Sequence, residues 1–264
     1  MAVVLLLLPA LCWARESYGR DLLQPKFAWH EQLLPPSRGQ SVVSDSQAAR
    51  VARTVVQYLN YNQGSPSFLR TLVHVRKVSA KSIPGVGRKY SLQFSTKHIQ
   101  TRQNLGRCLA TVFYRKDKPK PMIQVSCTDN KDADQRRKED YELYVKIKDT
   151  SFPAELENLA NIGSSYIAWE KSSENVGYVM SEIKDMKKWE SDNALEFDYT
   201  VLIDSDVSEG FSQTLSCHMR ITWNLELPIK VKYDCTSEDT SVESSDGSGD
   251  FSGTSAEFFT ESNF

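Results

Sequence analysis

The chain has 264 residues, of which 40% are hydrophobic and 25% are charged, and these are ordinary values for a folded soluble protein. Its formal net charge is −2, but residues 236–264 hold seven carboxylates and no Lys or Arg, which leaves 32 basic against 27 acidic residues elsewhere. This mild excess excludes the strongly basic class of nucleic-acid-binding proteins, so no nucleic-acid partner is expected.

An uncharged apolar run occupies residues 2–14 at the N-terminus. As a helix it would span about 20 Å, which is short of the roughly 30 Å of a bilayer core. The run is followed by the polar residues 15–17, and it therefore indicates a secretory signal peptide, residues 1–14, cut after Ala14. A retained short anchor is the less favoured alternative, and no membrane span is expected in the mature chain.

The cysteines repeat along the chain. Signal cleavage would remove Cys12 and leave four cysteines, an even number that suits an oxidising compartment and allows three pairings. Cys108 and Cys127 recur as Cys217 and Cys235, at offsets of 109 and 108 residues. The repeat therefore favours the disulfides Cys108–Cys127 and Cys217–Cys235.

The first regular element follows a polar, irregular lead-in over residues 15–44. From Ala48 to Leu59 the apolar residues recur every three or four positions, which predicts one apolar face of a helix. The residue types at 44–46 favour the start of a helix, and those at 60–64 favour its end.

Strand-like sequence follows this helix. Residues 72–78 are rich in Val, residues 83–87 form a predicted turn, and residues 90–94 alternate between apolar and polar. Two further β-rich runs flank a Lys/Pro turn within 108–127, so the two cysteines would face each other across the open end of a hairpin. We therefore predict a first module over residues 45–128, with one helix and about four antiparallel strands.

Residues 129–142 are densely charged with mixed sign and contain no Gly or Pro. Opposite charges four positions apart, as in Asp132 and Arg136, favour a solvated helical linker here. The apolar residues within Tyr141–Ile147 alternate and make this segment a candidate strand.

The helical pattern returns 108 residues later, in a second predicted helix over Pro153–Trp169. Gly163 stands where Val55 stands in the first helix, which indicates that the second sheet packs closer to its helix. The predicted strands follow in the same order, over Tyr178–Met186, Leu195–Ile203 and the hairpin Cys217–Cys235. The predicted fold is thus α+β, with a second module over residues 143–235 that repeats one helix on a four-stranded antiparallel sheet.

The last segment, residues 236–264, is rich in Ser and carboxylates and is predicted to be a disordered acidic tail. Ser241 and Ser255 in the tail, and Ser172 in the second module, fit a Ser-x-Glu phosphorylation pattern. Phosphate would add about −1.5 to −2 charge per site, and Ca²⁺ prefers such oxygen ligands. The tail could thus bind calcium or a mineral face, and a purely solubilising tail is an equally weighted alternative.

Catalytic chemistry is not indicated. The four histidines, at positions 30, 74, 98 and 218, are scattered and belong to no zinc-binding pattern, so neither a metal site nor a cofactor is expected. Gly85–Arg88 lacks the third glycine and the following helix of a phosphate-binding loop, and a turn is the favoured interpretation. The sequence therefore predicts a protein that is not an enzyme.

A helix, a meander and a disulfide-closed hairpin occur in this order on both sides of a charged linker. This layout resembles two tandem cystatin-like modules. Over about residues 45–235 it is similar to the latexin family, and this resemblance implies inhibition of an A-type metallocarboxypeptidase by a surface where the two modules meet. No inhibitory residue is matched. Cystatins inhibit papain-like proteases through a Gln-x-Val-x-Gly hairpin, and Ile83–Gly87 lacks that Gln and that Val, which argues against cysteine-protease inhibition.

Within this family, the signal sequence, the paired hairpin cysteines and the acidic Ser-rich extension are most similar to eggshell-matrix members. This resemblance implies a secreted extracellular matrix protein and adds calcium carbonate mineral as a candidate partner of the tail. Two functions therefore remain open: a protease inhibitor acting by steric occlusion, and a mineral-associated matrix protein with no protease target.

Overall fold

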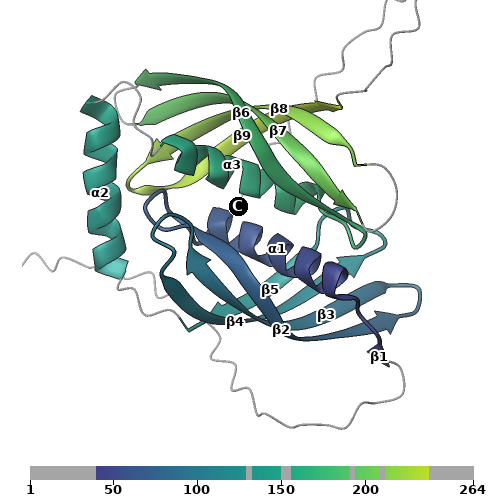
Figure 1. The fold of residues 1–264 in the computed structure, drawn as a ribbon. Coiled ribbons are helices and arrows are strands. Elements are labelled where there is room, and N and C mark those ends of the chain that lie inside the picture. Colours follow the sequence, from purple (N-terminus) through teal and green to yellow (C-terminus); the bar gives the residue numbers. More distant parts are fainter. Residues whose placement is uncertain (1–39, 129–132, 150–155, 191–193, 208–211, 238–264) are drawn as a thin grey trace, which may run out of the picture. The chain divides into compact units, whose positions relative to one another are not determined.

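A computed structural model describes residues 40–128, 133–149, 156–190, 194–207 and 212–237 (Figure 1). The first half contains β1 (Gln40–Ser41), α1 (Asp45–Asn62), β2 (Arg70–Ile83), β3 (Gly87–His98), β4 (Asn104–Arg115) and β5 (Met122–Cys127). The second contains α2 (Ala133–Asp149), α3 (Leu156–Lys171), β6 (Val176–Glu190), β7 (Leu195–Val207), β8 (Thr214–Asn224) and β9 (Leu227–Ser237). None of the helices in these ranges is long and apolar enough to cross a membrane.

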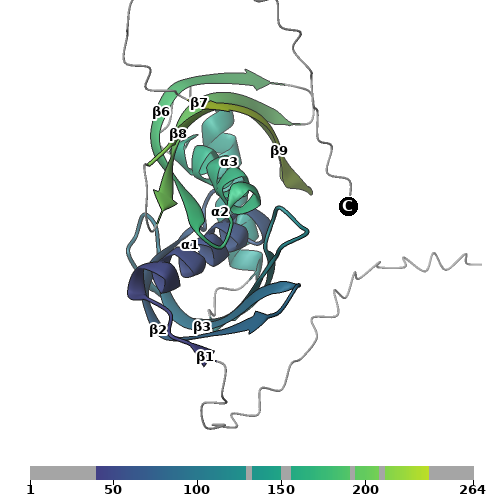
Figure 2. The ribbon, with the colours of Figure 1, turned by 90° about the vertical axis from the view of Figure 1, so that its right-hand side faces the viewer.

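Both sheets are antiparallel meanders in which each strand pairs with the next, in the orders β1-β2-β3-β4-β5 and β6-β7-β8-β9. The two-residue β1 extends the first four-stranded meander by pairing with Ala80 and Lys81 of β2. Each sheet curves around its own helix, α1 in the first module and α3 in the second (Figures 1 and 2). The predicted α+β fold of two cystatin-like modules is confirmed.

The apolar stripe predicted over Ala48–Leu59 is the buried face of α1. Ser44 is the N-cap, and its hydroxyl accepts a hydrogen bond from the Gln47 amide at 3.3 Å. Val51 and Val55 pack against inward-facing strand residues such as Tyr90, and together they form the core of the first module. The helix is thus held by the sheet that wraps its apolar face.

The candidate strand at Tyr141–Ile147 was a wrong prediction, because α2 continues through it to Asp149. Leu143 and Ile147 are buried in the core of the second module, whereas Tyr141 and Val145 are exposed. Buried positions four residues apart belong to one face of a helix, so the helical period prevails over the alternation seen in the sequence. The linker is therefore docked on the second module along this face.

The second helix, α3, is described from Leu156, and the predicted start at Pro153 lies outside the described residues. Nearly every α3 residue from Asn158 to Trp169 is buried, including polar ones such as Ser164. A helix that is buried on all sides has a second packing partner besides its own sheet. That partner is α1.

Candidate functional site

The candidate site is the module junction, defined here as the surface where α1 and β2–β5 meet α3 and β6. Its centre is Arg50 of α1, whose side chain is only 2% exposed. Gly177 of β6 lies directly against it, because a Cβ atom there would stand 2.8 Å from Cγ of Arg50. Only glycine leaves room for the aliphatic stem of the arginine, so the two modules fit closely at this point.

Aromatic side chains fill one end of the junction. Tyr58 of α1 meets Trp169 of α3 edge-on with ring centroids 5.1 Å apart, and Tyr61 lies 4.4 Å from Tyr166 by the same measure. The ammonium group of Lys120, on the β4–β5 turn, lies 4.5 Å above the ring centre of Trp169. Contacts of this kind contribute about 0.5–1.5 kcal/mol each beyond the area that they bury.

Polar contacts cross the junction as well. The carboxylate of Glu174, after α3, accepts hydrogen bonds from Nη1 of Arg88 at 2.8 Å and from the Tyr90 hydroxyl at 3.0 Å. Burial and the neighbouring Glu174 carboxylate raise the pKa of Tyr90, so its hydroxyl stays protonated and donates. Arg53 of α1 forms a further ion pair with Asp206 of β7. These contacts fix the rotation of one module against the other.

A groove of about 680 Å³ lies beside α1 at the junction and is lined by both modules. Val73 of β2, 50% exposed, and Val179 of β6, 42% exposed, are its exposed apolar residues. Arg53 and Lys77 line the same groove. The groove thus offers exposed apolar side chains together with charged ones, a combination that is also found in protein interfaces.

The hairpin edge of the first module, formed by its β2–β3 and β4–β5 turns, faces the second module. The turn at Ile83–Gly87 and the turn at Lys116–Lys120 border a pocket of about 580 Å³ together with Ser173–Asn175. The second module mirrors this arrangement, because its Asn224–Leu227 turn borders a pocket with Gln63–Pro66 of the first. Each module thus places its hairpin end against the loop that follows the other module's helix.

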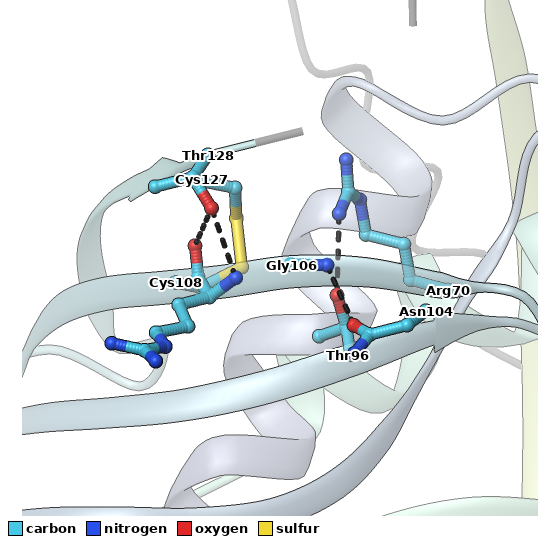
Figure 3. The surroundings of a disulfide bond; sticks show 8 residues. Arg70, Thr96, Asn104, Gly106, Cys108, Cys127 and Thr128 are labelled. Atoms are coloured by element: carbon cyan, nitrogen blue, oxygen red, sulfur yellow. Dashed lines mark hydrogen bonds between the residues drawn. A yellow bond between two sulfur atoms is a disulfide. The ribbon is translucent and has the colours of Figure 1, made fainter. Parts of the chain in front are cut away.

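The predicted site residues fall in different places. Cys108 pairs with Cys127, and Cys217 with Cys235, as disulfides between directly opposed residues of neighbouring strands. Figure 3 shows that the Thr128 hydroxyl closes the first hairpin beside its disulfide, accepting from the Arg107 amide at 3.0 Å.

Ser172, a candidate phosphorylation site, is 0% exposed, and its hydroxyl donates a 2.6 Å hydrogen bond to the carbonyl of Ala168. A kinase could reach that hydroxyl only if the end of α3 opened, so this burial argues against modification of the folded protein. Ser241 and Ser255, the two candidates in the tail, lie outside the described residues. The Ser-x-Glu pattern alone could not distinguish these cases.

The structure describes three of the four histidines, at positions 74, 98 and 218, and His30 lies outside the described residues. His98 is buried, and its ring binds the carbonyl of Ser67 and two backbone amides of the following turn. Within the ranges that the structure describes, no group of three or more His, Cys, Asp or Glu side chains is placed to hold a metal ion. Trp223, in the closing hairpin of the second module, is a core residue that packs edge-on against Tyr144 of α2.

The sequence reasoning missed how unevenly charge is distributed between the modules. Residues 40–128 contain 15 Lys and Arg and two carboxylates, whereas residues 133–237 contain 12 Lys and Arg and 20 carboxylates. The formal net charges are therefore +13 and −8. A separate charge count for each module would have shown this difference, but the count over both modules together concealed it.

The chain is similar to known proteins over most of its length. A family model described as Latexin matches residues 41–241. Ovocalyxin-32 of Gallus gallus is 32% identical over 231 residues, which cover 81% of this chain and 82% of the relative. Retinoic acid receptor responder protein 1 of Homo sapiens is 31% identical, covering 74% of each chain. Latexin of Homo sapiens is 28% identical, covering 71% of this chain and 91% of the relative.

Proposed function

The chain belongs to the latexin family, and we propose that it is a secreted extracellular matrix protein that inhibits an A-type metallocarboxypeptidase by steric occlusion. Members of this family are inhibitors rather than enzymes. Occlusion requires no catalytic group, only a surface that covers the entrance to an active site. The two disulfides, and the similarity to ovocalyxin-32, support secretion into an oxidising compartment.

The observation that carries the proposal is the close fit of the two modules at the Arg50–Gly177 contact. Modules fixed in this way present one continuous surface, and little conformational entropy is lost when such a surface binds a partner. We assign the groove lined by Val73 and Val179 as the part of that surface that meets the enzyme, because its exposed apolar residues can be desolvated on binding.

An inhibition assay with a pancreatic A-type carboxypeptidase and a small peptide substrate tests this function. The wild-type protein is expected to slow hydrolysis at micromolar concentration, with and without the tail after Ser237. The double variant Val73→Glu/Val179→Glu is expected to weaken inhibition about tenfold or more, because two buried charges would lack partners in the complex.

The control for each single change is Val86→Glu, which places one such charge on a similarly exposed valine of the β2–β3 turn, outside the groove. It is expected to inhibit as the wild type does. Loss of inhibition in the control alone would assign the contact to the hairpin edge rather than to the groove. No slowing by either form of the wild-type protein would remove the inhibitor function altogether.

A second candidate function rests on the tail, whose seven carboxylates and absent Lys and Arg favour Ca²⁺ or a calcium carbonate surface. Phosphorylation of Ser241 and Ser255 would add further oxygen ligands. A calcite-growth assay comparing the full chain with a chain that ends at Ser237, where β9 ends, tests this role. Equal growth in both would show that the tail does not act on the mineral.

A further inference from the structure

The outer face of the first sheet carries a set of cations with no acidic counterpart. Strands β2–β5 contain no Asp or Glu at all. Tyr90, Leu92 and Phe94 of β3 point inward to the core, so the residues between them point outward. Lys89 therefore lies on the outer face, and the strand register places Lys81 directly opposite it.

The same alternation and register place further cations on this face. The set comprises Lys77 and Lys81 of β2, Lys89 and Lys97 of β3, and Arg107 of β4, and we call it the basic face. Lys77 and Lys81 are four positions apart, or about 13 Å along the strand, whereas the Cβ atoms of Lys81 and Lys89 are about 5 Å apart. The cations thus form an extended array over three strands rather than a compact pocket.

The cations of the basic face are not neutralised by the folded body. Among the residues that the structure describes, none of the five forms an ion pair. Like charges directly opposite each other, such as Lys81 and Lys89, oppose folding. An array of this kind persists at a cost to the apo protein, and an anionic ligand would offset that cost.

Hydroxyl and amide side chains share the outward positions of these strands with the apolar Leu109, Phe113 and Met122. The hydroxyl and amide residues are Ser79 of β2, Ser91 and Gln93 of β3, Thr111 of β4 and Gln124 of β5, and the register joins Ser79, Ser91, Thr111 and Gln124 in one row across the sheet. Such groups both donate and accept hydrogen bonds, as sugar hydroxyls do. The basic face therefore offers cations for anionic groups and neutral polar groups between them.

The second module provides an internal comparison because it has the same fold. Its outer face carries carboxylates among its cations, with Asp198 opposite Arg220 and Asp234 beside Lys232. Asp198 and Arg220 form an ion pair at 2.7 Å, so that arginine is already neutralised. The fold itself does not require a basic outer face, and the array in the first module is a property of its own sequence.

We propose that the basic face is a binding site for a linear sulfated polysaccharide. Sulfate groups on an extended chain match cations spread over three strands, and the sugar hydroxyls match the polar row. Phe113 is the one aromatic residue among the outward positions of β2–β5, so the face offers no row of rings on which nucleic-acid bases could stack. The choice of ligand rests on the extracellular-matrix part of the proposed function and is independent of protease inhibition.

The test measures binding of a heparin oligosaccharide to the full chain by calorimetry at several salt concentrations. The variant Lys81→Ser/Lys89→Ser/Lys97→Ser, which leaves the groove-lining Lys77 unchanged, is compared with Lys187→Ser/Lys230→Ser/Lys232→Ser, which removes the same charge from the second sheet. The first variant is expected to raise Kd about tenfold or more near 0.15 M salt. It should also reduce the slope of log Kd against log salt concentration, because fewer counterions are released when fewer cations bind sulfate groups. The second is expected to change Kd less than about twofold.

Several outcomes would overturn the proposal. An equal loss in both variants would mean that only net charge matters, and no loss in the first would mean that the basic face is not the site. Binding of polyglutamate or duplex DNA as tight as that of heparin would remove the preference for a polysaccharide. If heparin bound only after the tail carboxylates were changed to amides, the protein's own tail would be the occupant of the face. The carboxypeptidase assay is a separate readout, so failure of either proposal is recognised independently of the other.

Discussion

Gly163 of α3 lies so close to Met219 of β8 that a Cβ atom on the glycine would stand 2.6 Å from the methionine sulfur. The same Cβ atom would lie 2.8 Å from Cδ1 of Ile221. In α1 the matching position is Val55, which packs in the core of the first module. The second sheet therefore packs closer to its helix than a side chain at position 163 would allow, as the substitution of Gly for Val in the repeat predicts.

This close approach predicts that Gly163→Ala destabilises the protein. In a solvent-exposed helix the change would add about 0.5–1 kcal/mol of stability through lower backbone entropy of the unfolded chain. Here Met219 and Ile221 are fully buried, and overpacking of a core costs about 1–3 kcal/mol. Denaturant unfolding should show a net loss, and a double-mutant cycle with Met219→Ala should reduce the loss. A gain in stability would show that Met219 and Ile221 can rearrange to accommodate the added methyl group at little cost.

Asp198 gives a prediction about acid stability. Its carboxylate accepts two hydrogen bonds from Arg220, at 2.7 and 2.9 Å, and one from the Trp189 indole at 3.1 Å. The bonded Arg220 guanidinium is the main reason that the pKa of Asp198 lies below its ordinary value. The resulting stability is present above the unfolded-state pKa and is lost as pH falls through the lower folded-state value.

Asp198→Asn is therefore expected to reduce the free energy of unfolding at pH 7. The difference from the wild type should shrink as the pH is lowered below about 4, the ordinary carboxyl pKa. Urea titrations between pH 2 and pH 7 measure this. Asp234→Asn, at an exposed aspartate of β9 that forms no ion pair among the described residues, is the control and should have little effect. A difference that is independent of pH would assign the role of Asp198 to packing.

Asp140 is expected to give the opposite dependence of stability on pH. It lies on α2 and accepts hydrogen bonds from the Ser67 hydroxyl at 2.6 Å and the Ser67 amide at 3.2 Å. Burial outweighs these bonds and raises the pKa of Asp140, so folding favours its neutral form. Stability at this site is therefore lost as pH rises from the unfolded-state pKa through the raised folded-state value.

Asp140→Asn keeps an oxygen acceptor for Ser67 and removes the buried charge. The free energy of unfolding should consequently rise relative to the wild type at pH 7, and the two proteins should converge near pH 3. The same urea titrations supply the measurement. A loss at pH 7 would mean that the charge itself strengthens the bonds from Ser67 by more than its desolvation costs.

Much of the fold could be predicted because the signals are local and repeated. The apolar stripes of Ala48–Leu59 and Leu156–Ile167, the alternating strands and the evenly offset cysteines each depend on residues close together in the chain. The error at Tyr141–Ile147 arose because alternation and helical spacing coincide over seven residues, and the contact of Ile147 with the second module's core decides between them.

The candidate site could be predicted much less well. Arg50 and Gly177 are 127 positions apart in the sequence, and nothing local marks either as half of a contact. The basic face needs the strand register, which brings Lys81 beside Lys89, and a charge count made for one module alone. Burial of Ser172 likewise depends on how α3 is enclosed, which a three-residue motif does not encode.

The two disulfides are expected to contribute nearly equally to the free energy of unfolding. Cys108 and Cys127 are separated by 19 positions, and Cys217 and Cys235 by 18, so each bridge constrains an unfolded loop of similar length. Loops of this size give about 3 kcal/mol in the chain-entropy model. Replacing either pair by alanine should lower the free energy of unfolding by about 2–4 kcal/mol, measured with denaturant. A loss confined to one pair would show that native-state contacts at that hairpin, rather than loop entropy, set the effect.

Phosphorylation at Ser172 tests whether burial prevents modification at a site that matches the sequence motif. A secretory-pathway kinase that recognises Ser-x-Glu should modify Ser241 and Ser255 in the native protein and leave Ser172 unmodified, because its hydroxyl is buried and donates to Ala168. Mass spectrometry of peptides from the native protein measures this, and the heat-denatured chain is the control in which Ser172 should become a substrate. Modification of Ser172 in the native protein as fast as that of Ser241 and Ser255 would mean that the end of α3 opens readily, because phosphate cannot be accommodated at a site that excludes solvent.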